Sequence, residues 1–524
     1  MELHKRSIFD ILPLELLELI VKRNLWIRTL RELRLVSRAM KDLVDPLTFS
    51  STTLSFEYVI TPEQLRYIAS GTSSNTRWTK RLHIEDLLPI EGPEYLDEID
   101  TFGPGRLAAQ KAALVPAIRA LKEVTQVEFD LNGDGPYINV VTALAGLPKL
   151  RILRMNGGEF RRQKVAAFSR ISNLEDLHIN SVEWSSGTRK AARRMIAASL
   201  PTLRELHLEQ FRQNNLVELS KILPAESSAE SLPPALPLTK FCLYGERFIA
   251  DSSCAHYFRN LTHLEMCNVG KAIAEKNAPF WDVLAESNVR LHSLLAYPLT
   301  SSLTRYLTSY VGLFSLRVEG QAESVEYYHR TEGEVSLAQS FVRSAIPHHR
   351  ATLQRLSFVT LDYRAWALTE DTLNCIATCK KLERVDLIYH FPREMQDDLS
   401  YAFGTPFIDM SHLLSRLLDG LNLPNLHTVI LSPAREPDKA FGTCVRSFDD
   451  IIPFLAAWQR LVCQVDLTSL SHSQVLNNPR FRLYAAGGDD EDEDDGPDMV
   501  FDVNTGHFRP HPAQDWNRDR SSSS

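Results

Sequence analysis

A short apolar pattern of the form L-x-x-L-x-L recurs along most of the chain and constrains the fold more than any other feature. The mean spacing of about 32 residues is typical of repeats that combine one strand with one helix. Weaker copies are centred on Leu82, Val127, Leu294 and Val465. The clear copies, named by their middle apolar residue, are centred on Leu153, Leu177, Leu206, Phe241, Leu264, Leu316, Leu356, Val385 and Val429.

Each copy predicts a short strand whose side chains alternate between two faces, so that its last two apolar residues point into a core. Helices are expected between the strands, for example over residues 188–200, 337–345, 368–379 and 410–421. One such unit cannot bury its own apolar face, whereas stacked units form a continuous core. The pattern therefore predicts an α/β fold, an irregular solenoid with a curved parallel sheet and helices on its convex side.

These hexads resemble leucine-rich repeats, with one departure. The asparagine that this family carries three residues after the last leucine is mostly replaced here, for example by Val182, Phe211, Val269 and Leu361. No regular asparagine ladder is therefore expected. The spacing of the copies also varies, for example 22 residues between Leu294 and Leu316 but 44 between Val385 and Val429. We assign residues 53–484 to this irregular repeat domain, with a flexible surface loop rich in Ser, Pro and Ala near residues 225–238.

One position of each strand faces away from the core and provides a row of candidate target-binding residues. Such sheet faces in repeat proteins commonly bind protein, and a chemically mixed row suits a polar protein interface. Each residue taken alone could equally be a solvated strand residue. The row contains Arg154, His178, His207, Glu265, Arg317, Ser357, Asp386 and Ile430.

Residues 9–50 carry three helix signals in quick succession. Pro13 suits the first position of a helix, where its missing N–H would be unpaired in any case. Thr29 opens an S/T-x-x-E capping box, which predicts the start of a second helix. Ser37 can cap a third helix, which Pro46 is expected to end. Three helices of this length bury little surface alone and carry more leucine than their own core needs.

The same segment resembles the F-box in the form common in fungal proteins. The matching residues are Leu12-Pro13-x-Glu15-Leu16-Leu17-x-x-Ile20, then 33–38 (LRLVSR) and 42–44 (DLV). The resemblance implies a helical module over residues 1–52 that binds a Skp-type adaptor, which in turn binds a cullin. An ordinary helical cap on the repeats is the alternative. The residues implied in the adaptor contact, or just beneath it, are Leu12, Pro13, Leu16, Ile20, Leu33, Val36 and Leu43.

Charge is concentrated at the C-terminal end. The chain has a formal net charge of -8, and residues 485–524, with 11 acidic and 3 basic residues, account for all of it. The neutral remainder has no basic stripe of the kind that binds phosphates, so no nucleic-acid partner is expected. The acidic run 489–495 (DDEDEDD) predicts a disordered, solvated tail over 485–524, although a basic partner for it is conceivable.

No catalytic, cofactor or metal site is expected from the sequence. The seven cysteines contain no CxxC pair and fit reduced thiols. Cys375 and Cys379, like His348 and His349, lack further ligands at suitable spacing and are interpreted as core or surface residues. Nucleotide-binding, zinc-protease and serine-hydrolase motifs are not present in a credible context.

The sequence shows neither a membrane span nor a secretory signal, so an intracellular protein, cytoplasmic or nuclear, is expected. These features together predict the non-catalytic substrate-recognition subunit of a Skp-cullin-F-box ubiquitin ligase, with an unknown protein target on the repeats. A scaffold with an F-box-like cap and no role in ubiquitin transfer is the alternative. An enzyme is a more distant one.

Overall fold

The computed structural model divides the chain into two compact units, Met1–Arg247 and Phe248–Ser524. The structure describes residues 12–13, 15–17, 19, 21, 27–55, 60–85, 104–130, 137–157, 165–182, 184–210, 216–224, 237–245, 248–250, 252–267, 276–297, 299–319, 332–359, 369–389, 423–426, 428–433, 482–485, 499–502 and 507–510. The predicted domain boundaries at residues 52 and 484 stay predictions.

The N-terminal part of the first unit is helical, as expected. Residues 15–17, 19 and 21 are helical, and helices α3 (Ile27–Leu33) and α4 (Arg38–Thr48) follow. The backbone N–H of Met40 donates to the Ser37 hydroxyl at 3.1 Å, which confirms Ser37 as the cap of α4. A small core formed by Val21, Leu30 and Val44 holds these helices together.

Two details of the helix prediction are wrong. Thr29 lies inside α3 and does not cap it, and Glu32 instead forms an ion pair with Arg28 at 3.6 Å along the same helix. Helix α4 continues past Pro46 to Thr48. Val44 and Thr48 lie one turn apart and are both buried, so packing of this face offsets the hydrogen bond that proline cannot donate.

The first unit contains a parallel sheet in the order β1-β2-β3-β4-β5-β6-β8. Register pairing places the middle residues of successive hexads, from Leu82 to Phe241, directly opposite one another. The strands are β1 (Ser51–Ser55), β2 (Arg81–Glu85), β3 (Gln126–Asp130), β4 (Ile152–Asn156), β5 (Asp176–Ser181), β6 (Glu205–Gln210) and β8 (Lys240–Tyr244).

Strand β1 was not predicted, because it has no hexad. Its Thr52 occupies the position opposite Leu82 and is buried. The hydroxyl of Thr52 is satisfied by the hydroxyl of Thr79 at 2.7 Å. A polar residue can therefore take the place of the middle leucine where a neighbouring side chain supplies a hydrogen bond.

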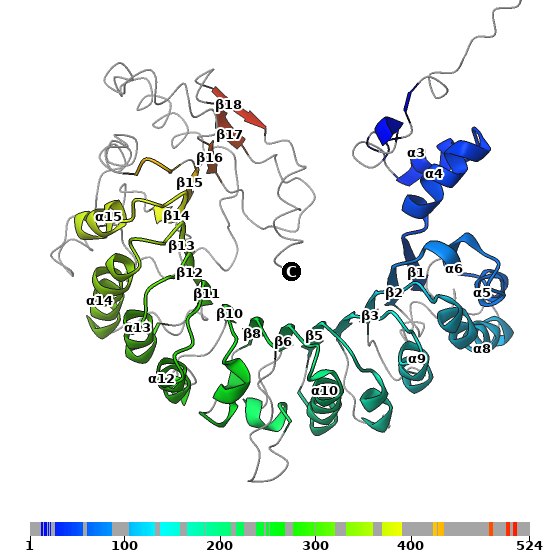
Figure 1. Ribbon diagram of the computed structural model, residues 1–524, viewed down its shortest axis with the longest axis horizontal. Coiled ribbons are helices and arrows are strands. Elements are labelled where there is room, and N and C mark those ends of the chain that lie inside the picture. Colours follow the sequence, from blue (N-terminus) through cyan, green and yellow to red (C-terminus); the bar gives the residue numbers. More distant parts are fainter. Residues whose placement is uncertain are drawn as a thin grey trace, which may run out of the picture. The chain divides into compact units, whose positions relative to one another are not determined.

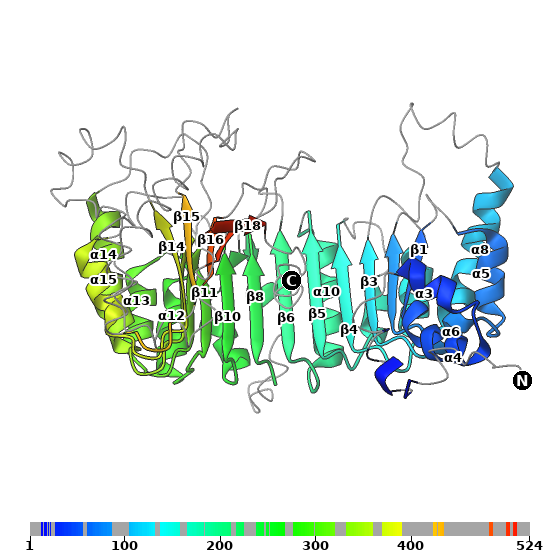
Figure 2. The same cartoon turned by 90° about the horizontal axis from the view of Figure 1, so that it is seen from above.

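The helices of the first unit that follow β1 lie along one face of its sheet (Figures 1 and 2). The predicted helix over 188–200 is confirmed by α10, whose Ala191 and Ile196 are fully buried. Besides the short strand β7 (Val217–Glu218), the remaining elements are α5 (Pro62–Ala69), α6 (Ser74–Trp78), α8 (Pro104–Ala120), α9 (Tyr137–Leu144), η1 (Val165–Arg170), α10 (Ser186–Ser199) and η2 (Leu219–Lys221).

A repeated backbone motif joins neighbouring repeats at the start of their strands. The carbonyl of Lys80 accepts hydrogen bonds from the N–H groups of Thr125 and Gln126 at 2.9 and 3.0 Å. Equivalent pairs of bonds recur down the sheet. Threonine hydroxyls add further links, such as the 2.7 Å bond from Thr202 to the carbonyl of Leu174. These bonds satisfy turn carbonyls where no regular asparagine ladder is present.

The second unit repeats the arrangement, with a parallel sheet running from β10 to β16. Helices α14 and α15 confirm the helices expected over 337–345 and 368–379. The helices are η3 (Ser252–Phe258), α12 (Ala278–Glu286), α13 (Ser301–Thr308), α14 (Glu332–His348) and α15 (Glu370–Ala377). The strands are β9 (Phe248–Ile249), β10 (His263–Cys267), β11 (Ser293–Ala296), β12 (Ser315–Glu319), β13 (Arg355–Val359), β14 (Arg384–Tyr389), β15 (Thr428–Pro433) and β16 (Arg482–Ala485).

The fold class predicted from the hexads is thus confirmed in each unit: parallel strands at repeat spacing, with helices between them. Within the second unit the middle residues again pair in register, from Leu264 through Val429. The weak hexad at Val465, the helix expected over 410–421 and the loop near 225–238 lie wholly or mainly outside the described residues.

The predicted disorder of residues 485–524 does not hold throughout. Strands β17 (Met499–Asp502) and β18 (His507–Pro510) pair antiparallel with each other, and β17 pairs antiparallel with β16. Phe501 and Phe508 are register partners, and short apolar stretches of this kind favour strands even next to an acidic run. The acidic run 489–495 itself lies outside the described residues.

In the part of the chain that the structure describes, no helix has both the length and the apolar character needed to cross a bilayer.

Candidate functional site

The residues implied in adaptor binding divide by exposure. Leu16 and Val36 expose 48% and 60% of their surface, and Pro13 is also exposed. Leu33 and Leu43 are half-buried and pack on the small helical core described above. Leu12 is likewise half-buried, and Ile20 lies outside the described residues. The assignment of these residues to an adaptor contact stays a prediction.

Two further exposed apolar residues in this segment were not singled out from the sequence. Leu19 is 49% exposed and Leu35 is 83% exposed. Leu19 occupies a position that the first motif leaves unspecified, and Leu35 lies within the match over 33–38 but was not among the implied contact residues. Of the large apolar side chains that are exposed among the described residues, half therefore fall within residues 16–36.

The predicted target-binding row is formed by register in the first unit. Across strands β4, β5 and β6, Arg154, His178 and His207 are direct neighbours. Missed members of the same row are His83, Glu128 and Cys242, on β2, β3 and β8. The signal for them was present, because each directly follows the middle residue of a hexad.

His83 and Glu128 form an ion pair at one end of this row. The Nδ1 atom of His83 lies 3.2 Å from Oε2 of Glu128, and each side chain is about one-third exposed. The hydrogen bond that His83 donates to the Glu128 carboxylate raises the pKa of His83 and lowers the pKa of Glu128. The carboxamide of Asn156 also donates to Asp130 at 2.9 Å, so this end of the face is polar and internally paired.

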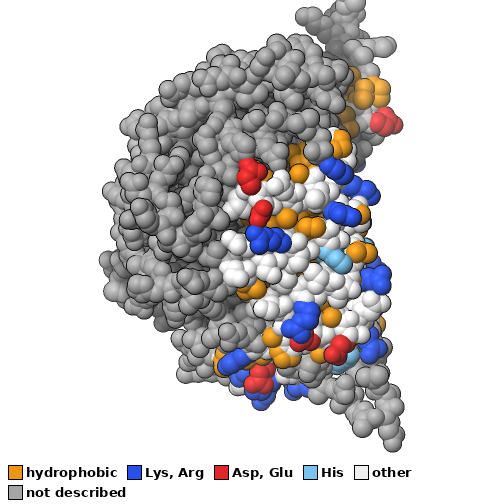
Figure 3. Space-filling model, turned by 90° about the vertical axis from the view of Figure 1, so that its left-hand side faces the viewer, with side chains coloured by type: hydrophobic (Ala, Val, Ile, Leu, Met, Phe, Trp, Pro, Cys, Tyr) orange, Lys and Arg blue, Asp and Glu red, His pale blue; other side chains and the backbone are white. Residues whose placement is uncertain are grey.

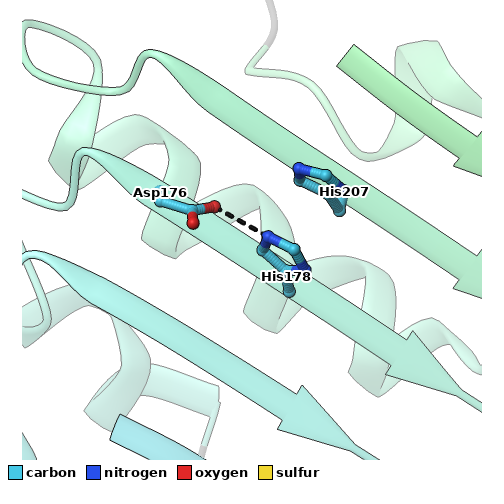
Figure 4. A group of neighbouring side chains, drawn as sticks. All are labelled: Asp176, His178 and His207. Atoms are coloured by element: carbon cyan, nitrogen blue, oxygen red, sulfur yellow. Dashed lines mark ion pairs between the residues drawn. The ribbon is translucent and has the colours of Figure 1, made fainter. Parts of the chain in front are cut away.

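The centre of the row is a compact histidine cluster (Figure 4). The rings of His178 and His207 stack with centroids 3.6 Å apart and an angle of 15° between their planes. Nε2 of His178 lies 3.0 Å from Oδ1 of Asp176, two residues earlier on β5. Burial lowers the pKa of His207, whose Nε2 is 3.8 Å from the sulfur of Cys242. Burial also raises the pKa of Glu209, further along β6.

In the second unit the predicted row is likewise formed by register, from Glu265 on β10 through Arg317, Ser357 and Asp386. Leu295 on β11 is the member that sequence reasoning missed. Only Arg317 is exposed, whereas Ser357 is buried and the others are half-buried.

Two features complete the row of the second unit. The carboxylate of Asp386 is paired on its own strand with Arg384, Nε to Oδ1 at 2.9 Å. Ile430 is the register partner of Asp386, and its side chain lies outside the described residues. The row therefore presents one exposed cation among paired or covered groups.

Of the cysteine and histidine pairs noted in the sequence, Cys379 and His349 belong to the core, whereas Cys375 is half-buried and His348 is exposed. Cys379 is fully buried, and burial raises its pKa to about 11. His349 is 1% exposed, and its Nδ1 accepts a hydrogen bond from the N–H of Leu313 at 3.4 Å. Burial lowers the pKa of His349 to about 4. Neither geometry favours a nucleophile or an acid–base catalyst.

The helix-bearing side of the second unit has a different character. Over α14 and α15, basic and acidic side chains are intermixed with single apolar ones (Figure 3). Arg343 on α14 pairs with Asp371 on α15, Nη2 to Oδ2 at 2.5 Å. This side is an ordinary solvated surface, and the candidate binding residues lie on the strands.

Comparison with known proteins identifies no matching family model and no matching curated protein. Among solved structures, the chain is similar to the "Crystal structure of Rad7 and Elc1 complex in yeast". The identity is 13% and the TM-score 0.37, over 85% of this chain and 99% of that chain. A similarity this low indicates neither a common function nor a common partner.

Proposed function

We propose that this protein is a non-catalytic receptor that connects a protein target to a Skp-type adaptor and, through the adaptor, to a cullin. Its N-terminal helices bind the adaptor, and the strand faces of its repeats bind the target. Ubiquitin transfer to the target then follows from proximity, because the receptor raises the local concentration of the target at the ligase.

The observation that carries this proposal is the exposure of leucine and valine side chains in an otherwise folded helical segment. Leu16, Leu19, Leu35 and Val36 are each about half exposed or more, while Leu17 and Leu30 in the same segment are buried. A helical cap that only closed the repeats would need no such surface. Clusters of exposed apolar residues favour a protein contact, and the F-box-like motifs suggest the adaptor as the partner.

The strand faces support the second half of the proposal. Their rows combine cations, carboxylates, imidazoles and few apolar groups, a composition that suits a selective polar interface better than phosphate binding. Most of these groups are paired with one another, as His83 is with Glu128. A target must therefore match an arranged pattern of charges, which favours selectivity.

The test is affinity capture of a purified Skp-type adaptor by the full-length chain carrying Leu16→Asp and Val36→Asp. Both positions are exposed in the free protein, so the fold should persist, while a carboxylate in the apolar contact is costly. We expect adaptor binding to weaken at least about tenfold, the change that corresponds to about 1.4 kcal/mol. Circular dichroism should be unchanged.

The matched control is Val311→Asp, because Val311 is 60% exposed, like Val36, and lies in the second unit. This variant should bind the adaptor normally. Equal binding by the double variant and the control would contradict the proposal. With a cullin added to the purified adaptor, capture of the adaptor without the cullin would instead support a scaffold with no role in ubiquitin transfer.

A further inference from the structure

Three potential metal ligands lie together on the strand face of the first unit. Asp176 and His178 are two residues apart on β5, so both point to the same side of the sheet. His207 on β6 is the register partner of His178. Figure 4 shows the two imidazoles and the carboxylate side by side on these adjacent strands.

Distances within the cluster are short enough for one ion. Each of the three residues offers one ligand atom, and these atoms all lie within 4.8 Å of one another. The side chains are 11–15% exposed, so they are partly removed from water. Among the described residues no other group of histidine, cysteine or acidic side chains comes together in this way.

We propose that Asp176, His178 and His207 bind a divalent transition-metal ion, with zinc the best fit. Two imidazole nitrogens and one carboxylate suit Zn²⁺, whereas Mg²⁺ and Ca²⁺ prefer oxygen ligands only. Three protein ligands leave a fourth position for water or for a group of a bound partner. The ion would lie in the row that the proposed target surface uses.

The surroundings of the three ligands suit such an ion. Oε2 of Glu205 is 3.8 Å from Nε2 of His207, close enough to orient this ring. The sulfur of Cys242 also lies 3.8 Å from this nitrogen. Cys242 is on β8, which pairs with β6 on the side away from β5. The further carboxylate of Glu205 beside the ligands increases the negative potential that attracts a cation.

Only side-chain adjustment is needed to close the site. Ligand atoms bound to one zinc ion at about 2.0–2.2 Å lie roughly 3.3 Å apart. The 4.8 Å limit on the ligand atoms therefore leaves at most about 1.5 Å to be closed by rotation of side chains. The two rings stack at 3.6 Å with nearly parallel planes, so they must rotate for their nitrogen lone pairs to converge on one ion. The paired strands β5 and β6 hold their backbones in place.

The test is calorimetric titration of the chelator-treated, full-length protein with zinc chloride near neutral pH. We expect one saturable site with a dissociation constant in the micromolar range or below. His178→Gln and His207→Gln should each weaken binding at least about tenfold. The matched control is His83→Gln, a histidine of the same row that pairs with Glu128, and it should leave binding unchanged.

A spectroscopic measurement guards against variants that fail to fold. Cobalt chloride added to the wild-type chain should give the intense visible absorption of a four-coordinate ion, and Asp176→Asn, which keeps the side-chain shape, should reduce it. Absence of a saturable site in the wild type would overturn the proposal. So would equal binding by His178→Gln, His207→Gln and the control. These readouts do not involve the adaptor, so their failure would leave the proposed function standing.

Discussion

The N-terminal helices and the repeats use leucine in opposite ways. In the repeats, hexad leucines such as Leu177 and Leu206 are fully buried. In the helical segment, Leu35, in the turn between α3 and α4, is 83% exposed although it lies within a strongly apolar stretch. The difference shows that a repeat finds its apolar partner within the chain, whereas the helical segment has more apolar surface than its small core covers.

This contrast has a simple physical origin. Each internal repeat has a neighbour on both sides, and therefore every inward position is covered. The helices surround a core of only a few residues, namely Val21, Leu30 and Val44 with Leu33, Leu43 and Leu47 packed on it. Such a core cannot bury further leucines on the opposite side of the same short helices.

The largest expected effect on the free energy of unfolding comes from truncation of a repeat leucine. Leu177→Ala should lower the free energy of unfolding by about 3 kcal/mol, because it leaves a cavity in a packed core. Leu35→Ala should change it by less than about 0.5 kcal/mol. Urea denaturation of the full-length chain, followed by circular dichroism, measures both. Similar losses in the two variants would show that the helices are as tightly packed as the repeats.

Acid should weaken the repeats through the buried His349. Its folded-state pKa of about 4 lies below the unfolded value of about 6.5, so the unfolded chain takes up the proton first as the pH falls. Stability should therefore drop by about 2 kcal/mol between about pH 7 and about pH 5. Denaturation at both pH values tests this, and His349→Gln should show a smaller drop. A drop of the same size in this variant and in His348→Gln would assign the acid sensitivity elsewhere.

A smaller effect is expected from the partly buried ion pair of the N-terminal helices. Nε of Arg34 lies 2.5 Å from Oδ1 of Asp45, whose side chain is 8% exposed. Arg34→Met leaves this carboxylate without its cation and should cost about 1–2 kcal/mol. Hydrogen exchange should speed up in α4 but not in the repeat strands. The control is Arg28→Met, since the pair of Arg28 with Glu32 is exposed and contributes little.

The smallest effect on stability is expected from the ion pair of His83 and Glu128 on the strand face. Because the pKa of His83 is raised in the folded state, its pairing with Glu128 stabilises the fold below the unfolded pKa of about 6.5. This contribution disappears as the pH rises through the folded pKa. Since both side chains are about one-third exposed, it should stay below about 1 kcal/mol. Melting temperatures of wild type and His83→Gln should differ more at about pH 5.5 than at about pH 8.5, and a larger difference at high pH would contradict this.

Local periodicity alone was sufficient to predict the strands that carry a clear hexad. An alternating apolar pattern specifies which side chains point inward whatever the neighbours are, and so Leu153, Leu177 and Leu206 could be placed on one line of the core before any contact was known. The outward row followed by the same alternation. Strands without the pattern could not be found this way, as β1 shows with Thr52 in the core position.

Contacts between distant segments decided the rest. Helix ends depended on packing, because burial of Val44 and Thr48 extends α4 past Pro46. The cluster of Asp176, His178 and His207 exists because parallel pairing brings β5 and β6 into register. Alternation assigns each residue to a face of the sheet. Its neighbour on that face depends on loop length and strand pairing, which involve whole repeats and cannot be read from a short stretch of sequence.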